Sequence, residues 1–260
     1  MAEIEYSLED GIGTILLNRP ARKNAFTLEM VDCWADVLRE AEADVAVRAI
    51  IVTGAGDAFC SGVDLDTIDP ATLTPLDRKR QLTDRVHRVA LTLDGMSTPV
   101  IAAVNGAAIG AGLDMALMCD MRIAGRSARL SEGYVRVGLV PGDGGCYYLP
   151  RLVGTAKALE LLLTGEFVDG EEAARIGLVN EVVEDDQLLA AARLLARKIA
   201  AAPPIAVGMI KRATYQCARV DLRTALDLIS SHFGVIVTTE DSAEAMTAFR
   251  ERRPGVFNGR

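Results

Sequence analysis

The sequence predicts an α/β fold, because apolar runs of strand length alternate with segments that have helical periodicity. Two of these runs, 48–54 and 99–104, have the composition of buried strands. After about residue 165 the pattern is largely helical. We therefore expect a core domain over residues 1–200 and a helical C-terminal segment over residues 201–260.

The first expected element is a β-hairpin. Residues 4–8 alternate apolar and polar side chains, "EDG" provides a turn, and 14–18 form a second strand-like run. A loop over 18–26 leads to a helix that begins after Thr27, which is a suitable N-cap. The apolar residues expected on one face of that helix are Val31, Trp34, Leu38 and Ala41.

The alternation continues along the rest of the chain. An irregular loop with Gly, Asp and Pro residues is expected over 56–76. The elements expected next are a charged helix at about 77–94, the strand at 99–104, a helix at 112–119 and a short strand at 121–124. Helical patterns then cover 145–164, 170–178, 186–201 and 221–250, and Pro203-Pro204 opens a further long helix.

Composition and charge argue against several classes of function. The formal net charge is −8 and aromatic residues are few, which argues against nucleic-acid binding. The longest apolar stretch, 101–120, contains Asn105, Asp114 and three glycines, so we expect no membrane span. Five widely spaced cysteines and an N-terminus without a signal-peptide pattern indicate a reduced, cytoplasmic location.

Two glycine-centred loops that follow strands are the strongest functional signal. Small residues at 106–112 allow a tight turn into a helix whose first N–H groups, near Ala111, lack intrahelical acceptors. The loop "FCSGVDL" at 59–65 offers further N–H groups near Val63. Two such donors on one oxygen form an oxyanion hole, which stabilises an enolate made from a thioester. The alternative for the second loop is a simple surface turn.

A single carboxylate, Asp114, lies three residues beyond Ala111 and so on the same face of the helix start. It is either a group that moves a proton or a first-turn acid that complements the helix dipole. The residues alone leave both alternatives open. No dinucleotide fingerprint, P-loop, nucleophile elbow or histidine-based metal site is complete in the sequence.

Several motifs occur in order along nearly the whole chain: "AFCSGVDL", then "PVIAAVNGAAIGAGLDMALMCDMRIA", then "VGLVPGDGG". Together they resemble the crotonase (enoyl-CoA hydratase/isomerase) superfamily. The resemblance implies a spiral of ββα repeats with a helical C-terminal trimerisation segment. It implies an acyl-CoA thioester as substrate and a homotrimer or a dimer of trimers as the assembly. It also implies no metal and no cofactor, because coenzyme A is part of the substrate.

The resemblance also assigns roles to individual residues. The two oxyanion donors would be the backbone N–H groups of Val63 and Ala111. On the C-terminal helix, Phe249 and Arg252 would reach the coenzyme A of a neighbouring subunit. The residues expected along the coenzyme A path are Arg22, Lys23, Ala25, Ser61, Asp64 and Leu65.

The sequence departs from the family pattern at the catalytic acids. Typical hydratases of the family use two glutamates to hold one water, and these positions are Asp114 and Tyr134 here. Tyrosine, with a pKa near 10, is a poor base at neutral pH. Glu132, two residues away, is a candidate replacement. Asp143 is either an acid near the acyl pocket or a cap of the following helix.

Three functions are therefore considered. The leading hypothesis is an enoyl-CoA hydratase, a lyase in which Asp114 activates or positions water with help from Glu132 or Tyr134. The second is an enoyl- or dienoyl-CoA isomerase that uses Asp114 as proton carrier. The third is an acyl-CoA-binding protein that has lost its catalysis. The sequence leaves open the acyl chain length and branching, the pathway and the choice between trimer and hexamer.

Overall fold

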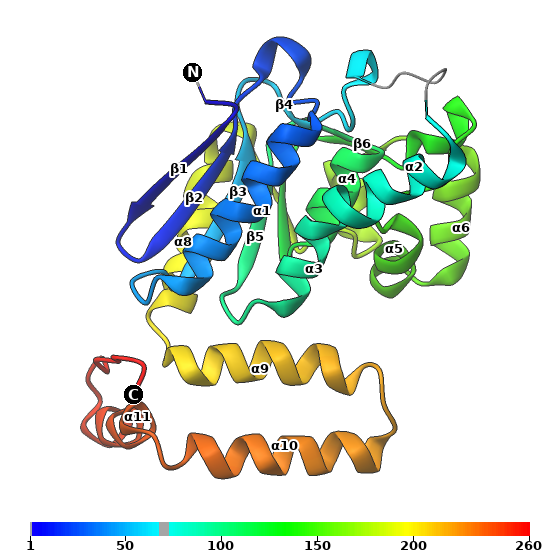
Figure 1. The fold of residues 1–260 in the computed structure, drawn as a ribbon. Coiled ribbons are helices and arrows are strands. Elements are labelled where there is room, and N and C mark those ends of the chain that lie inside the picture. Colours follow the sequence, from blue (N-terminus) through cyan, green and yellow to red (C-terminus); the bar gives the residue numbers. More distant parts are fainter. Residues whose placement is uncertain (1, 68–72) are drawn as a thin grey trace.

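The computed structural model describes residues 2–67 and 73–260. A six-stranded sheet and a four-stranded sheet form the centre of the molecule (Figure 1). The six-stranded sheet has the order β1-β2-β3-β5-β7-β10, in which only β1 and β2 pair antiparallel. Its strands are β1 (Ile4–Glu9), β2 (Ile12–Leu17), β3 (Ala49–Gly54), β5 (Val100–Val104), β7 (Met121–Gly125) and β10 (Glu181–Val183).

The smaller sheet has the order β4-β6-β8-β9, and its first three strands are parallel. Its strands are β4 (Ala58–Cys60), β6 (Ala107–Ile109), β8 (Arg129–Ser131) and β9 (Val168–Asp169). Each of β3, β5 and β7 is followed within a few residues by a strand of this second sheet and then by a helix. This succession is the ββα repeat that the family resemblance implied.

Helices cover both faces of the larger sheet (Figure 1). On one face lie α1 (Leu28–Ala43) and α3 (His87–Gly95), and Trp34 is fully buried there. On the other face α8 (Leu188–Ala200) packs Leu188 and its neighbours against Ile51 and Ile101. As predicted, Thr27 is the N-cap of α1, and its hydroxyl accepts a hydrogen bond from the amide of Met30 at 3.1 Å.

The predicted charged helix at 77–94 is longer and less regular than expected. It consists of α2 (Pro75–Gln81), a π-helical turn at Leu82–Val86, and α3. Such π-turns widen a helix locally and are frequent at functional sites. The remaining helices are α4 (Ala111–Leu117), α5 (Gly145–Val153), α6 (Thr155–Thr164), α7 (Gly170–Arg175), α9 (Pro204–Cys217), α10 (Leu222–Ile236) and α11 (Glu240–Glu251).

Three predicted boundaries were wrong. The loop expected over 56–76 contains β4, and a three-residue strand is too short to show a period. The single helical pattern at 145–164 is broken at Gly154, whose φ of +79° is left-handed. The pattern at 221–250 is two helices, because Thr239 caps a new one: its hydroxyl accepts from the amide of Ser242.

The C-terminal helices extend away from the two sheets (Figure 1), and α9 and α10 run antiparallel. A buried lysine attaches α9 to the core: Lys211 Nζ lies 2.8 Å from Asp120 Oδ2 and 2.9 Å from the carbonyl oxygen of Thr98. The predicted division into domains at residue 200 stays a prediction. Within the described residues, no helix is both long enough and apolar enough to span a membrane.

Gly112 in α4 marks a close approach of two chain segments. A Cβ atom at this position would overlap the carbonyl oxygen of Cys60 and would lie 2.9 Å from the amide nitrogen of Gly62. Both neighbours are backbone atoms, which cannot rotate away. Only glycine therefore allows the start of α4 to touch the end of β4.

We expect Gly112→Ala to lower the free energy of unfolding by about 1–3 kcal/mol, as overpacking does in well-packed interiors. This loss should exceed the gain in helix propensity, which is about 1 kcal/mol for Gly→Ala. Urea denaturation measures the change. Gly95→Ala is the matched control, because a Cβ at Gly95 would have no heavy atom within 4 Å. Equal stability of the two variants would contradict the close approach.

Candidate functional site

The two glycine-centred loops meet where Gly112 touches β4, which brings the amides of Val63 and Ala111 to the same place. Val63 forms a bridge to Phe26 in which Phe26 N donates to Gly62 O and Asp64 N donates to Phe26 O, both at 2.9 Å. The N–H of Val63 therefore faces the opposite side. Ala111 is the first residue of α4, so its N–H has no intrahelical acceptor.

Both residues line a cavity of about 580 Å³. No acceptor for either amide is found among the residues that the structure describes. The positive end of the α4 dipole adds to the two unsatisfied donors. This geometry suits an oxygen atom on which negative charge develops.

The same cavity contains most of the residues predicted for the coenzyme A path. Asp64 is held by Arg19, whose Nη2 donates at 2.9 Å and lowers the pKa of that carboxyl. Two of the predicted cations are themselves ion-paired, Arg22 with Asp66 and Lys23 with Asp57. The predicted residues that line the cavity are Arg22, Lys23, Ala25, Ser61, Asp64 and Leu65.

The structure does not bring Phe249 and Arg252 to this cavity. Phe249 lies near the end of α11 and is 83% exposed, and Arg252 is the C-cap of that helix. Their expected contact is with the coenzyme A of another subunit. That role stays a prediction.

A second, mostly apolar cavity of about 310 Å³ adjoins the first. Val63, Tyr134 and Leu139 line both, so the two cavities share a wall. The π-helical turn between α2 and α3 contributes Leu82 and Val86 to its wall. Tyr134 and Asp143 are also among the residues that line this cavity.

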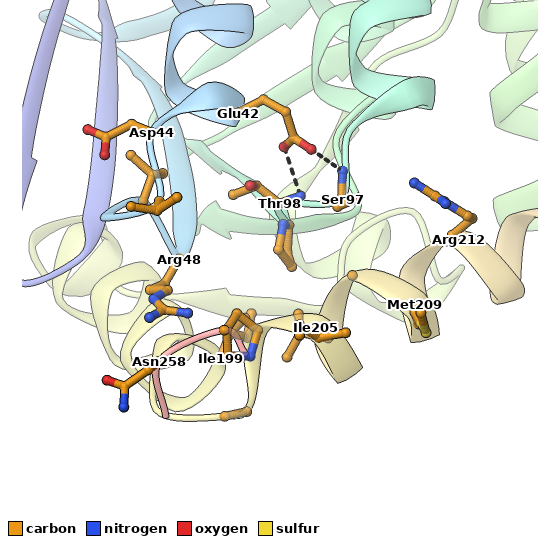
Figure 2. A pocket seen from close by; sticks show the side chains of 18 residues that line it. Glu42, Asp44, Arg48, Ser97, Thr98, Ile199, Ile205, Met209, Arg212 and Asn258 are labelled. Carbon is orange, nitrogen blue, oxygen red and sulfur yellow. Dashed lines mark hydrogen bonds between the residues drawn. The ribbon is translucent and has the colours of Figure 1, made fainter. Parts of the chain in front are cut away.

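A third cavity, of about 380 Å³, lies where the core meets the start of α9 (Figure 2). One of its lining groups is the Glu42 carboxylate, which accepts hydrogen bonds from the amides of Ser97 at 2.8 Å and Thr98 at 3.0 Å. Its lining contains none of the residues predicted for the site. We therefore place the candidate site in the first two cavities.

Tyr134 connects two buried acids. Its hydroxyl oxygen lies 2.7 Å from Asp114 Oδ2 and 2.9 Å from Asp143 Oδ2. A tyrosine hydroxyl has one proton to donate and can also accept. Both contacts are hydrogen bonds if Tyr134 donates to one of the two carboxyl groups, which is ionised, and accepts from the other one, which is protonated. Besides the Tyr134 hydroxyl proton, the cluster therefore holds a second proton, which one of the two carboxyl groups carries.

Glu132 lies beside Asp114 at the back of this cluster. The two side chains are 1% and 0% exposed, and neither lines the two cavities. Their contact is possible because α5 begins with Gly145. A Cβ there would lie 2.5 Å from Asp114 Oδ1 and 2.8 Å from Glu132 Oε2. The structure thus brings together all three side chains predicted for catalysis.

Burial raises the pKa of every acid in the cluster, because it disfavours the charged form. It raises the pKa of Asp114 to about 7 and, together with the neighbouring Asp114 charge, that of Glu132 to about 10. Burial also raises the pKa of Asp143, while the hydrogen bond from Tyr134 acts in the opposite direction. The pKa of Tyr134 is raised far above its usual range, so its hydroxyl stays protonated.

Asp143 belongs to the site and does not cap the following helix. The N-cap of α5 is Gly144, without a side-chain cap. Next to Asp143, the carbonyl oxygen of Gly142 lies 2.8 Å from His87 Nε2, which therefore carries the ring proton. Sequence reasoning missed this contact, because nothing in the pattern links a helix residue to a loop 55 positions later.

The comparisons with known proteins agree on one family. Residues 7–260 match the family model described as "Enoyl-CoA hydratase/isomerase". The chain is 39% identical over 246 residues to the short-chain-enoyl-CoA hydratase of Clostridium acetobutylicum, covering 94% of this chain and 93% of that protein. It is 37% identical over 258 residues to the 1,2-epoxyphenylacetyl-CoA isomerase of Escherichia coli, covering 97% of each.

Solved structures give the same result for the fold. An enoyl-CoA hydratase from Bacillus anthracis superimposes with a TM-score of 0.93 and 32% identity, and all of both chains is covered. An enoyl-CoA hydratase from Mycobacterium smegmatis also gives 0.93, at 32% identity, covering 98% of this chain and 99% of that one. The α/β spiral predicted from the motifs is confirmed.

The raised pKa of Asp114 predicts that the protein loses stability as pH rises. A folded-state pKa raised from about 3.9 to about 7 leaves stability fully present below about pH 4 and lost as pH rises through about 7. The expected slope is about 1.4 kcal/mol per pH unit for one such group. Asp114→Asn should reduce this slope in urea titrations at several pH values. The exposed Asp186→Asn is the control, and equal slopes in both variants would contradict the raised pKa.

Proposed function

Because the chain belongs to the enoyl-CoA hydratase/isomerase family, we propose that it adds water across the 2,3 double bond of an enoyl-CoA thioester, or removes that water in reverse. It is an acyl-CoA-acting enzyme. The observation that best supports the hydratase reaction is the pair of amides from Val63 and Ala111, without a described acceptor, in a cavity next to the one that Tyr134 and Asp143 line.

In this proposal the first cavity binds the coenzyme A portion and the second binds the acyl chain. The thioester oxygen lies between the amides of Val63 and Ala111, at the positive end of α4. Carbons 2 and 3 then lie near Tyr134, which lines both cavities. Charge that moves from the double bond onto the thioester oxygen is stabilised there as an enolate.

The acids divide the proton transfers between them. Asp143, ionised and facing the acyl cavity, takes a proton from water while the water oxygen bonds to carbon 3. Tyr134 donates its proton to carbon 2 of the enolate in the same step in which it takes the proton of Asp114, so no free tyrosinate forms. The proton on Asp143 then returns to Asp114 through the Tyr134 hydroxyl, which contacts both acids. The chemistry needs no group besides these side chains, the two amides and the substrate.

A second candidate function is double-bond isomerisation. Tyr134 stands where typical hydratases have a second glutamate, so Asp143 is the only carboxyl of the cluster that faces the acyl cavity. A shift of a double bond needs a proton carrier and no water. The chain Asp114–Tyr134–Asp143 can move a proton in that way.

We expect the protein to hydrate crotonyl-CoA, measured as loss of absorbance of the conjugated thioester. Asp143→Asn should lower kcat by about 100-fold or more, as is typical for loss of a general base, and Tyr134→Phe should do the same by breaking the relay. Asp186→Asn is the control. Turnover of a 3,5-dienoyl-CoA without hydration of crotonyl-CoA would favour the isomerase. Tight acyl-CoA binding without turnover of any thioester would indicate lost catalysis.

We also propose that the enzyme is a homotrimer or a dimer of trimers in the cytoplasm. Large apolar side chains on the C-terminal helices are exposed in the single chain, among them Leu222 at 74%, Phe233 at 67% and Phe249 at 83%. A second copy that covers this surface would remove a large apolar area from water. The same contact would place Phe249 and Arg252 at a neighbour's coenzyme A. The five free cysteines fit a reducing compartment.

Light scattering of the protein as it elutes from a size-exclusion column measures the molar mass and hence the number of copies in the assembly. We expect three or six copies for the wild type, and dissociation in Phe233→Asp, because a buried charge without a partner is costly. Arg223→Ala, which changes an exposed polar residue of the same helix, should leave the assembly intact. A monomeric wild type would contradict the proposal.

A further inference from the structure

Glu132 has the surroundings of a neutral acid that never reaches the substrate. It lies between β8 and the 3-10 turn at Gly133–Val137, is 1% exposed and lines neither cavity of the site. Neither of its carboxyl oxygens has a hydrogen-bond partner among the described residues. An ionised carboxylate in such a position would be strongly destabilising.

Asp114 offers the missing partner. Its Oδ1 is also buried and without a described hydrogen-bond partner, and it faces the same glycine, Gly145, as the Glu132 carboxyl. Two buried carboxylates in contact repel each other, but a proton between them turns the repulsion into a charge-assisted hydrogen bond. No lysine or arginine of the described chain forms an ion pair with either acid. A shared proton is therefore the available way to satisfy both.

The surroundings determine which acid keeps the proton. Once Asp114 has given up its proton, Tyr134 donates a hydrogen bond to its other oxygen and stabilises the negative charge, whereas Glu132 has no such donor. The titratable groups that face the pair from the neighbouring elements are Tyr134, Asp143 and Cys146. None of them supplies a positive charge, and His87 acts on Asp143. The charge is thus better placed on Asp114.

We propose that Glu132 is a positioning residue that stays protonated and donates its hydrogen bond to Asp114 Oδ1. This inference rests on the proposed function, because it concerns the proton that Asp114 supplies through Tyr134. It changes the role predicted from the sequence, in which Glu132 replaces the second water-activating glutamate. The raised pKa of Glu132 agrees with it. When Asp114 gives up its proton during turnover, the Glu132 hydrogen bond stabilises the carboxylate that forms.

Two substitutions separate the two roles in the assembled enzyme. Glu132→Gln keeps a neutral donor of the same shape, so kcat should stay within about 3-fold of wild type and KM should not change. Glu132→Leu removes the donor, so kcat should fall by about 10-fold or more, the typical loss for one buried hydrogen bond to a charge, with KM unchanged. Loss of the donor also makes Asp114 harder to ionise, so the upper limb of the kcat–pH profile should move to higher pH in Glu132→Leu only.

Infrared spectroscopy measures the protonation of Glu132 directly, and its result does not depend on whether the enzyme is a hydratase. The infrared difference spectrum between wild type and Glu132→Gln at pH 8 should contain the band of a protonated carboxyl group. A carboxylate band in its place would overturn the inference. A loss of kcat in Glu132→Gln as large as in Asp143→Asn, with the upper limb of the profile moved to lower pH, would also overturn it. Circular dichroism and thermal unfolding confirm that each variant folds.

Discussion

The site depends on one backbone contact, the approach of the α4 start to the carbonyl oxygen of Cys60. This contact is possible only because residue 112 has no side chain. It joins two loops that come from different ββα repeats and that are about fifty residues apart in the sequence. An oxyanion hole needs two donors at fixed separation, and a contact between two main chains defines that separation more firmly than flexible side chains can.

Behind these amides lies a group of acids that the protein buries at a considerable energetic cost. Asp114, Glu132 and Asp143 are each at most 4% exposed, and within the described residues none of them forms an ion pair with a lysine or arginine. Protons shared through the Tyr134 hydroxyl and across the Asp114–Glu132 contact replace the missing counter-charges. The same arrangement keeps one acid ionised and another protonated near neutral pH, which is the condition for general acid–base catalysis by a single cluster.

Helices and strands that are long enough to show a regular apolar pattern could be predicted from the sequence, whereas three-residue strands and contacts between distant segments could not. The helix after Thr27 and the buried strands β3 and β5 were predicted close to their observed limits, because periodicity and capping are local properties. The strands β4, β6 and β8 have three residues each and depend on partners far away in the chain. The start of α5 at Gly145 was also predicted, but the burial of Glu132 and the role of Asp143 depend on the distant side chains that surround this helix start, which no local pattern reveals.

The π-helical turn at Leu82–Val86 separates two parts of one helix that have different neighbours. On its C-terminal side, Arg88 Nη1 lies 2.7 Å from Asp32 Oδ1 and fastens the helix to α1, while Leu82 and Val86 line the second, mostly apolar cavity. The reacting acids come from other elements entirely. Under the proposed function, substitutions at Leu82 or Val86 would reshape the acyl cavity without touching the acids that move protons, so acyl preference and chemistry could change separately.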